Sequence, residues 1–273
     1  MRNRKRVVLA SLGFACAVVA ATAFAATAAP GDSVPDLVGA VRGMGPISVE
    51  ATVASAAFPG RSHFVDSANG DDYFIGPDSH AVEAYFSSAL DRSRAYESKP
   101  DTAAIAAKAD GVLDRCFVGS VDDRRSIRRT VSVIDSPADR SPNGKKFSPG
   151  YTDVMVNYQL VRGGVAYPTA ASATFDGATG ELLSLVQFSR PVTVSLKPTL
   201  DRNAAIGLAA ERLRMPVHKV DSASLFVFAP RDGRQQLAWD VTLHTGDGGI
   251  TTGVQLRILL DANGGTTVIQ PRR

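Results

Sequence analysis

The four histidines are the first residues to test for chemistry, because histidine serves both as a metal ligand and as a general base. They are His63, His80, His218 and His244. No two of them lie within one helical turn of each other, and the chain contains no H-E-x-x-H sequence. The commonest zinc-protease signature is therefore absent. His244 ends an expected strand, where a solvent-facing residue is a better interpretation than a metal ligand.

The short motifs of nucleophilic and nucleotide-binding sites are also missing. Residues Lys146–Gly150 (KFSPG) lack the first glycine of the G-x-S-x-G motif that presents a catalytic serine. The chain has no C-x-x-C, no G-x-x-x-x-G-K-[ST], and no G-x-G-x-x-G after a strand. The sequence therefore predicts a protein that is not an enzyme, with no catalytic residue, no cofactor and no metal. A hydrolase with an unrecognised site is the alternative.

Three carboxylates cluster in the stretch DSANGDD, Asp66–Asp72. Calcium takes oxygen ligands, and exported proteins meet it at high concentration, but the spacing does not match the EF-hand loop. Aspartate, asparagine and glycine together are typical of a tight turn. We therefore expect an acidic hairpin turn here.

The densest basic cluster is RRSIRR, which contains Arg124, Arg125, Arg128 and Arg129. One interpretation is the solvated face of a strand. The other is a binding patch for an acidic peptide or an anionic envelope polymer, because arginine recognises carboxylates and phosphates through paired hydrogen bonds. Trp239 lies on an alternating strand and is expected in the core.

The first 29 residues have the layout of a secretory signal peptide. Four basic residues precede an apolar run from Val7 to about Ala26, and small residues then offer Ala-x-Ala cleavage sites. We expect cleavage, a mature chain without a membrane span, and a location that is either secreted or at the cell envelope.

Cleavage changes the charge balance and the cysteine count. Four of the 30 basic residues lie in the leader, which leaves 26 basic against 27 acidic residues in the mature chain. A near-neutral chain gives no electrostatic case for nucleic acid. Cys116 alone remains of the two cysteines, so no intramolecular disulfide is expected and Cys116 is interpreted as a buried structural residue.

One turn is repeated in the chain. FDGATGELLSL and LLDANGGTTVI each place an aspartate four residues before a glycine, between two apolar segments. The aspartate carboxylate accepts hydrogen bonds inside such a turn, and glycine supplies the positive φ. Asp176 with Gly180 and Asp261 with Gly265 are therefore the expected structural turn residues. A degenerate earlier copy is expected at Tyr73–Phe86.

Helices are expected before two sets of strands. Ser98–Leu113 and Leu196–Leu213 both place Lys-Pro before an aspartate and then Ala-Ala-Ile, with apolar residues at helical spacing. Asp101 and either Asp201 or Thr199 are the expected N-caps. Strands of alternating polarity follow each helix. The sequence therefore predicts an α+β fold of tandem units, each with one helix packed on an antiparallel β-sheet.

This pattern also predicts the domain organisation. The expected parts are a signal peptide (1–29), a lead-in segment (30–46), a strand-rich N-terminal piece (47–97), a degenerate first unit (98–196) and a second unit (197–273).

The segment Lys197–Gln270, with LDRNAAIGLAAERL, SLFVF, QLAWDVTLH and LRILLDANGGTTVI, resembles a PepSY domain. The middle section is similar to the tandem PepSY-like units of secreted bacterial proteins, and also to the propeptides of thermolysin-type metalloproteases. The resemblance implies an exported domain of a kind often proposed to bind peptides or to restrain proteases. It implies no reaction, because the aspartate and glycine of the motif form a turn.

The leading hypothesis is therefore a non-enzymatic, exported PepSY-like protein. It would bind a peptide, a protease or a cell-envelope component, through an edge strand or a groove between helix and sheet. Besides the hydrolase, a structural protein of the envelope is an alternative, favoured if the chain self-associates. The sequence leaves the oligomeric state and the partner open.

Overall fold

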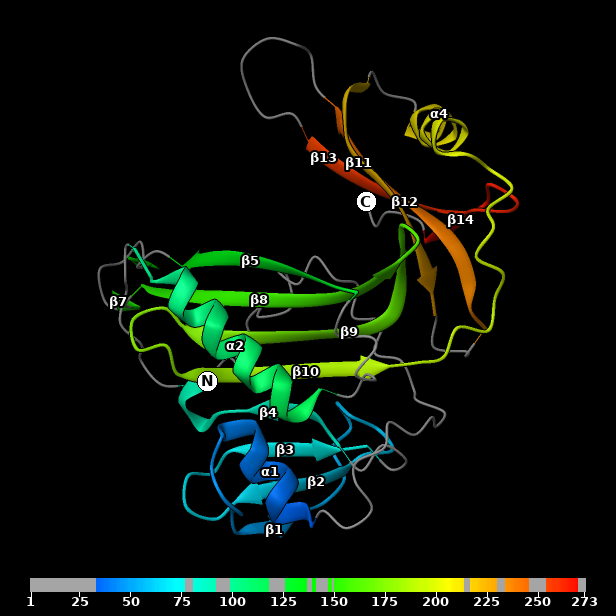
Figure 1. Cartoon of the computed structure of the whole chain (residues 1–273). Coiled ribbons are helices and arrows are strands. Elements are labelled where there is room, and N and C mark those ends of the chain that lie inside the picture. Colours follow the sequence, from blue (N-terminus) through cyan, green and yellow to red (C-terminus); the bar gives the residue numbers. More distant parts are fainter. Residues whose placement is uncertain are drawn as a thin grey trace.

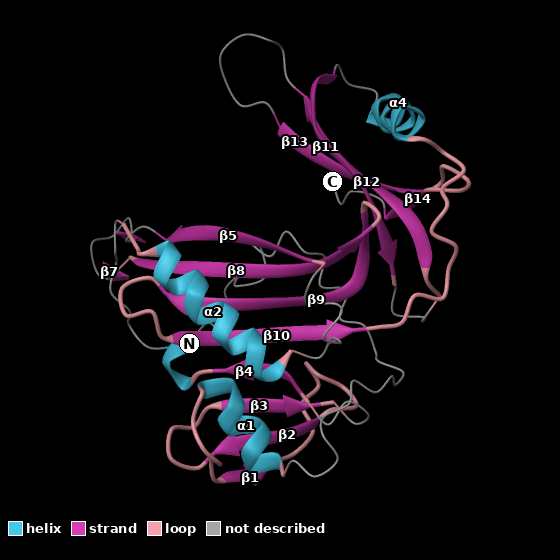
Figure 2. Ribbon diagram, viewed as in Figure 1, coloured by secondary structure: helices cyan, strands magenta, loops and turns pink. Residues whose placement is uncertain are grey.

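The computed structural model describes residues 33–76, 81–91, 99–117, 126–136, 139–140, 147–148, 150–213, 217–229, 234–245 and 254–269. Strands dominate this part of the chain (Figure 1, Figure 2). Its helices are α1 (Val34–Arg42), the short 3-10 helix η1 (Ser88–Asp91), α2 (Thr102–Cys116) and α4 (Arg202–Leu213). Its strands are β1 (Val49–Ala51), β2 (Ser62–Asp66), β3 (Asp72–Ile75), β4 (Val82–Phe86), β5 (Ile127–Ser136), β6 (Asp139–Arg140), β7 (Phe147–Ser148), β8 (Tyr151–Arg162), β9 (Val165–Asp176), β10 (Leu182–Ser189), β11 (Val217–Phe228), β12 (Gln236–Thr245), β13 (Val254–Asp261) and β14 (Thr267–Ile269).

Twelve of these strands form one mixed sheet, in which β9 is the junction. The order along the sheet is β1-β2-β3-β4-β10-β9-β11-β12-β13-β14, and β8 and then β5 extend it from the other side of β9. β10 pairs with β9 only from Thr169 onwards. The first residues of β9, Val165 and Ala166, pair instead in parallel with Leu225 and Phe226 of β11. Figure 1 shows the start of β9 bending towards β11.

The predicted fold class, tandem units of one helix on its own antiparallel sheet, is therefore wrong. The strands belong to one large mixed sheet that carries only three short α-helices in the described residues. The physical reason lies at the junction. β9 is longer than the part of it that β10 covers, so its first residues have main-chain groups that need partners, and β11 supplies them.

The helices bury their apolar faces on two parts of the sheet. α1 and α2 share one core with strands β3, β4, β8, β9 and β10. Ile105, Ala109 and Val112 of α2 are at most 5% exposed, as their helical spacing predicts. Asp101 caps α2 by accepting a hydrogen bond from the Ala104 N–H at 2.9 Å, which confirms the expected N-cap.

α4 covers the second core, over β11, β12 and β13. The Asp201 carboxylate accepts a hydrogen bond from the Ala204 N–H at 2.8 Å, as expected of an N-cap. Ala205 and Ala209 are the fully buried residues of α4, while Ile206 is only partly buried. Trp239 is 8% exposed in this core, as predicted, and its indole N–H donates to the Leu200 carbonyl at 2.9 Å.

Within the described residues the aspartate-to-glycine turn occurs three times. Asp176–Gly180 joins β9 to β10, Asp261–Gly265 joins β13 to β14, and Asp66–Gly70 joins β2 to β3. In each turn the glycine N–H donates to the aspartate carbonyl at 2.8 or 2.9 Å. The glycines have φ values of 65°, 67° and 74°, which favour glycine.

The degenerate copy expected at Tyr73–Phe86 coincides with a hairpin, since β3 and β4 pair with each other. His80, its expected turn residue, lies outside the described residues. DSANG has the spacing of the other two turns, and its position between β2 and β3 confirms the acidic hairpin turn expected at Asp66–Asp72.

Candidate functional site

Strand β5 is an open edge of the large sheet. All ten of its residues pair with β8, and in the described chain it pairs with no other strand. Two large apolar side chains in its middle are exposed, Val131 at 39% and Val133 at 44%. A long exposed edge strand is a template for pairing with another chain. β5 is therefore the first candidate for a binding surface.

A single hydrogen bond establishes which main-chain groups of β5 face outward. The Val161 N–H donates to the Ser126 carbonyl at 2.9 Å, immediately before β5 begins. Bonded and non-bonded pairs alternate along an antiparallel ladder. Even-numbered residues from Arg128 onward therefore bond to β8, and the odd-numbered residues direct their N–H and C=O groups outward. Those residues are Ile127, Arg129, Val131, Val133 and Asp135.

The side chains of these odd-numbered residues lie on the face of the sheet that α2 covers, since alternate residues share a face. Arg129 forms an ion pair with Asp110 of α2. The Tyr158 hydroxyl of β8 donates to the same carboxylate at 2.8 Å. A hollow of about 350 Å³ lies here, which we name the β5 hollow. It is lined by Asp110, Leu113, Asp114, Ile127, Arg129 and Tyr158.

The buried hydroxyl of Tyr158 should make the free energy of unfolding depend on pH in the alkaline range. Burial, and then the hydrogen bond to Asp110, raise the pKa of its hydroxyl above the ordinary value of 10.0. Below pH 10 the hydroxyl is protonated in both the folded and the unfolded chain, so its contribution is fully present. Above pH 10 the unfolded chain releases the proton and the folded chain keeps it, so the free energy of unfolding falls as pH rises.

We expect urea unfolding at increasing pH to show this loss, and Tyr158→Phe to reduce its slope above pH 10. Tyr73 and Tyr85 have pKa values raised chiefly by burial and then by Asp71, and they add to the slope in the wild-type chain. An unchanged slope in Tyr158→Phe would contradict the assignment.

The structure separates the two described arginines of the RRSIRR cluster. Arg129 lies on the α2 face and is paired with Asp110, whereas Arg128 is exposed on the opposite face of β5. Arg124 and Arg125 lie outside the described residues. The binding patch of these four residues thus remains a prediction.

The acidic stretch Asp66–Asp72 forms the turn between β2 and β3 and the residues beside it. Asp66 and Asp71 are each 2% exposed. Nη1 of Arg42 lies 3.5 Å from Asp66 and 3.4 Å from Asp71. The Ser88 N–H (2.7 Å) and the Tyr85 hydroxyl (3.2 Å) also donate to Asp71. Within the described residues no group of three or more acidic, histidine or cysteine side chains is arranged to hold a metal.

Three residues near β2 form a hydrogen-bonded chain of the kind that hydrolases use. Asp72 Oδ1 lies 2.6 Å from His63 Nε2, and His63 Nδ1 lies 3.0 Å from the Thr52 hydroxyl. The same Nδ1 also lies 3.3 Å from the Val53 carbonyl, whereas the Asp72 carboxylate beside Nε2 favours the tautomer in which Nδ1 is unprotonated. The β5 hollow does not include these residues.

The contacts of Cys116 and His244 fit a structural role for both residues. Cys116 is half-buried beside the first core, and its thiol donates to the Val112 carbonyl at 3.1 Å. His244 has a side chain that is 44% exposed, and its Nδ1 lies 3.6 Å from Asp221. His80 and the leader are outside the described residues, and the side chain of His218 is not described. No helix in the described ranges has the length and apolar character to span a membrane.

Comparisons with known proteins assign no family. A scan of protein-family models and a search of curated proteins gave no match. Among solved structures, the chain is similar to the C-terminal domain of YpeB from Bacillus megaterium, with 12% sequence identity, a TM-score of 0.46, and coverage of 84% of this chain and 90% of that one. It is also similar to an uncharacterised protein from Eubacterium rectale ATCC 33656, with 11% identity, a TM-score of 0.46, and coverage of 82% and 76%.

At these values the two similarities indicate neither a family nor a function for this chain. The PepSY resemblance stays a prediction from the sequence.

Proposed function

We propose that this chain is an exported, non-enzymatic binding protein that captures an extended segment of a partner polypeptide by strand addition at β5. The observation that carries the proposal is the open edge of β5, with outward main-chain groups at alternate residues and two exposed valines. In strand addition, main-chain hydrogen bonds supply affinity and the alternate side chains supply specificity. The resemblance to PepSY domains and the expected leader agree with this proposal.

The side chains of β5 define the chemistry of the partner. In antiparallel pairing, residues directly opposite each other share a face and interact. Apolar residues should therefore lie opposite Val131 and Val133, an acidic residue opposite Arg129 and a basic residue opposite Asp135. A segment with the order basic-x-apolar-x-apolar-x-acidic meets all four requirements. It would cover the β5 hollow with its side chains.

The partner could be a protease, whose restraint the resemblance suggests, or a component of the envelope. β5 itself, RTVSVID from Arg129 to Asp135, has the same order of side chains, so a second copy of this chain is the competing occupant. The experiment must therefore separate capture of a foreign segment from self-association.

A peptide-binding experiment tests the proposal. The probe is a fluorescein-labelled peptide, Arg-Thr-Val-Ser-Val-Thr-Glu, followed by fluorescence anisotropy. Val131→Pro should weaken binding at least about tenfold, because proline removes an outward N–H without removing a bond to β8. Val131→Ala keeps that N–H and should lose only about two- to threefold.

Two outcomes would contradict the proposal. One is equal binding of the peptide by the wild-type chain and by Val131→Pro, when circular dichroism shows that both proteins are folded. The other is a wild-type chain that sediments as a dimer at all accessible concentrations and does not bind the peptide. That result would mean that a second copy of the chain occupies the edge of β5. Hydrolysis of a p-nitrophenyl ester by wild type, and not by His63→Ala, would favour the hydrolase alternative instead.

A further inference from the structure

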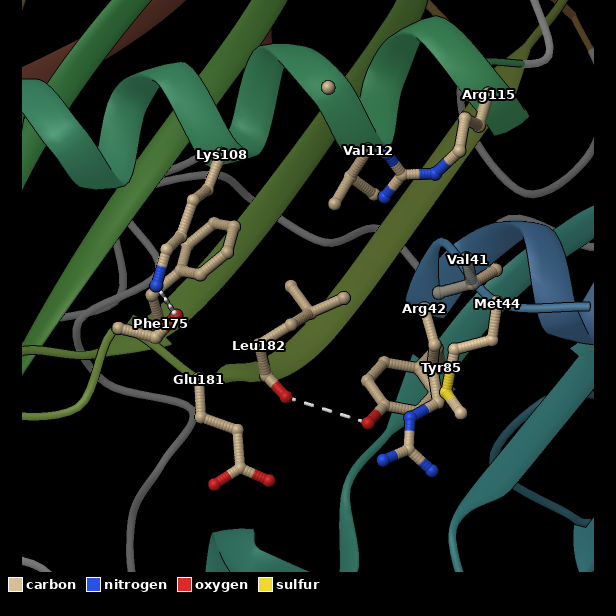
Figure 3. A pocket seen from close by; sticks show the side chains of 12 residues that line it. Val41, Arg42, Met44, Tyr85, Lys108, Val112, Arg115, Phe175, Glu181 and Leu182 are labelled. Atoms are coloured by element: carbon tan, nitrogen blue, oxygen red, sulfur yellow. Dashed lines mark hydrogen bonds between the residues drawn. The ribbon is translucent and has the colours of Figure 1, made fainter.

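A second hollow lies on the other side of α2, away from β5. It has a volume of about 390 Å³, and it is enclosed by the end of α1, the middle of α2, β4 and the turn between β9 and β10. We name it the turn hollow. Figure 3 shows its lining residues, among which Lys108 and Arg115 extend from α2 and Arg42 comes from α1. The proposal at β5 uses none of these side chains.

The inner surface of the turn hollow is apolar. Val41, Val112 and Phe175 line it and are at most 5% exposed. Leu182 lines it as well, and Met44, which is 59% exposed, lies at its mouth. Ligand pockets commonly have volumes of about 300–1,000 Å³ and combine apolar walls with a few placed polar groups. The turn hollow has room for one large apolar side chain or a short alkyl chain.

Two cations border this apolar surface without a carboxylate partner. The Lys108 ammonium donates to the Gly180 carbonyl at 3.1 Å, and the Arg115 Nε donates to the Ala40 carbonyl at 2.8 Å. Among the described residues no carboxylate lies within ion-pair distance of either cation. A lysine has three donors and an arginine five, so both retain donors for a ligand.

Three acidic groups near the hollow, Asp66, Asp71 and Glu181, form no ion pair with these cations. Asp66 and Asp71 are paired with Arg42, and they are buried. Glu181 lines the hollow, but Figure 3 shows its carboxylate pointing away from α2. Lys108 and Arg115 are therefore the cations of this hollow that have no described carboxylate within ion-pair distance.

Each of the two cations lies close to a glycine. A Cβ atom at Gly180 would lie 2.7 Å from the Lys108 Nζ, and one at Gly43 would lie 3.1 Å from the Arg115 Cζ. Both glycines have positive φ, 65° and 68°, in the turn and at the end of α1. Lys108 and Arg115 are themselves exposed, so these contacts place the two cations beside the hollow without fixing them.

From this geometry we infer that the turn hollow binds a carboxylate attached to an apolar body, with the carboxylate at Lys108 and Arg115 and the apolar body against Val112 and Phe175. Arginine and lysine form their strongest hydrogen bonds with such ionised acceptors. A free peptide C-terminus after an apolar residue and a medium-chain fatty acid share this chemistry.

Isothermal titration calorimetry with matched ligands tests the inference and separates the two sources. The probes are octanoate and octanol, and acetyl-Leu-Phe with a free carboxylate or as its amide. Wild type should bind at least one acid about tenfold more tightly than its uncharged counterpart. Octanoate alone would identify the fatty acid, and the peptide acid alone would identify the C-terminus. Equal binding of acid and uncharged forms, or no binding, would overturn the inference.

Variants of Lys108 and Arg115 test whether these two cations cause the preference for the acid over its uncharged counterpart. Lys108→Met and Arg115→Gln should each reduce acid binding about tenfold and leave binding of the uncharged form unchanged, which also shows that the hollow is intact. Arg128→Gln, on β5, is the control and should change neither. Acid selectivity that survives in the Lys108→Met, Arg115→Gln double variant would overturn the assignment. Because strand addition at β5 is measured with a different probe, either proposal can fail alone.

Discussion

Replacing Arg42 by methionine is expected to destabilise the fold by about 3–5 kcal/mol, since it leaves buried charges without their partner. Asp66 and Asp71 are each 2% exposed, and Arg42 is the cation within 3.5 Å of both. Their hydrogen bonds with neutral donors remain in the variant but do not neutralise the charge. Methionine keeps an apolar stem beside the core. Urea unfolding at neutral pH, with a free energy from linear extrapolation, measures the loss.

Two comparisons make this prediction specific. Arg257→Met removes an ion pair with Asp240 in which the arginine side chain is 41% exposed, and it should cost less than about 1 kcal/mol. Combining Arg42→Met with Asp71→Asn removes one of the two buried carboxylate charges that lack a cation, and it should recover part of the stability. If Arg42→Met were no worse than Arg257→Met, the buried network would not hold α1 to the N-terminal strands.

The local features of this chain were predictable because they depend on neighbouring residues. The N-cap of α2 follows from Asp101 three residues before Ala104, and the buried face of α2 follows from the spacing of Ile105, Ala109 and Val112. The turns follow from an aspartate and a glycine at fixed separation, as at Asp176 and Gly180. Such signals require no knowledge of the rest of the fold.

The arrangement of the sheet was not predictable in the same way. Which strand pairs with Val165 and Ala166 depends on where β10 ends and on which distant strand can reach that edge. Leu225 lies 60 residues further along the chain, and no local pattern connects it with Val165. The prediction of separate units failed at this contact.

The candidate sites illustrate the same limit. The sequence RRTVSVID indicates a strand, but the side of it that stays open depends on the pairing of Ser126 with Val161. Arg129 is paired with Asp110 of α2, a contact that the sequence RRSIRR does not indicate. Lys108 and Arg115 gave no signal in the sequence, because a hollow formed by three separate segments has no motif. Their spacing of seven residues on one helix, two turns apart, is the only available hint.

The second large effect is expected at Asp176, in the turn that closes β9 onto β10. Three hydrogen bonds converge on its Oδ1, from the N–H of Ala178 at 2.9 Å, the N–H of Thr179 at 2.8 Å and the hydroxyl of Thr179 at 3.1 Å. Asp176 is 4% exposed, whereas Ala178 and Thr179 are exposed, so water remains within reach of the three donors. Asp176→Ala should destabilise the chain by about 2–3 kcal/mol, because hydrogen bonds to a charged acceptor contribute about 1.5–3 kcal/mol. Thermal and urea unfolding measure the change.

The equivalent turn at Asp261 is the internal control for this prediction. Asp261 has the same place in its turn, but it is half-buried and accepts one described side-chain hydrogen bond, from the Asn263 N–H at 2.9 Å. Asp261→Ala should therefore cost only about 1 kcal/mol. Asp176→Asn keeps an oxygen at the Oδ1 position and should lose less than half as much as Asp176→Ala. Equal losses at Asp176 and Asp261 would mean that the backbone reversal at the glycine, and not the carboxylate, determines the strength of these turns.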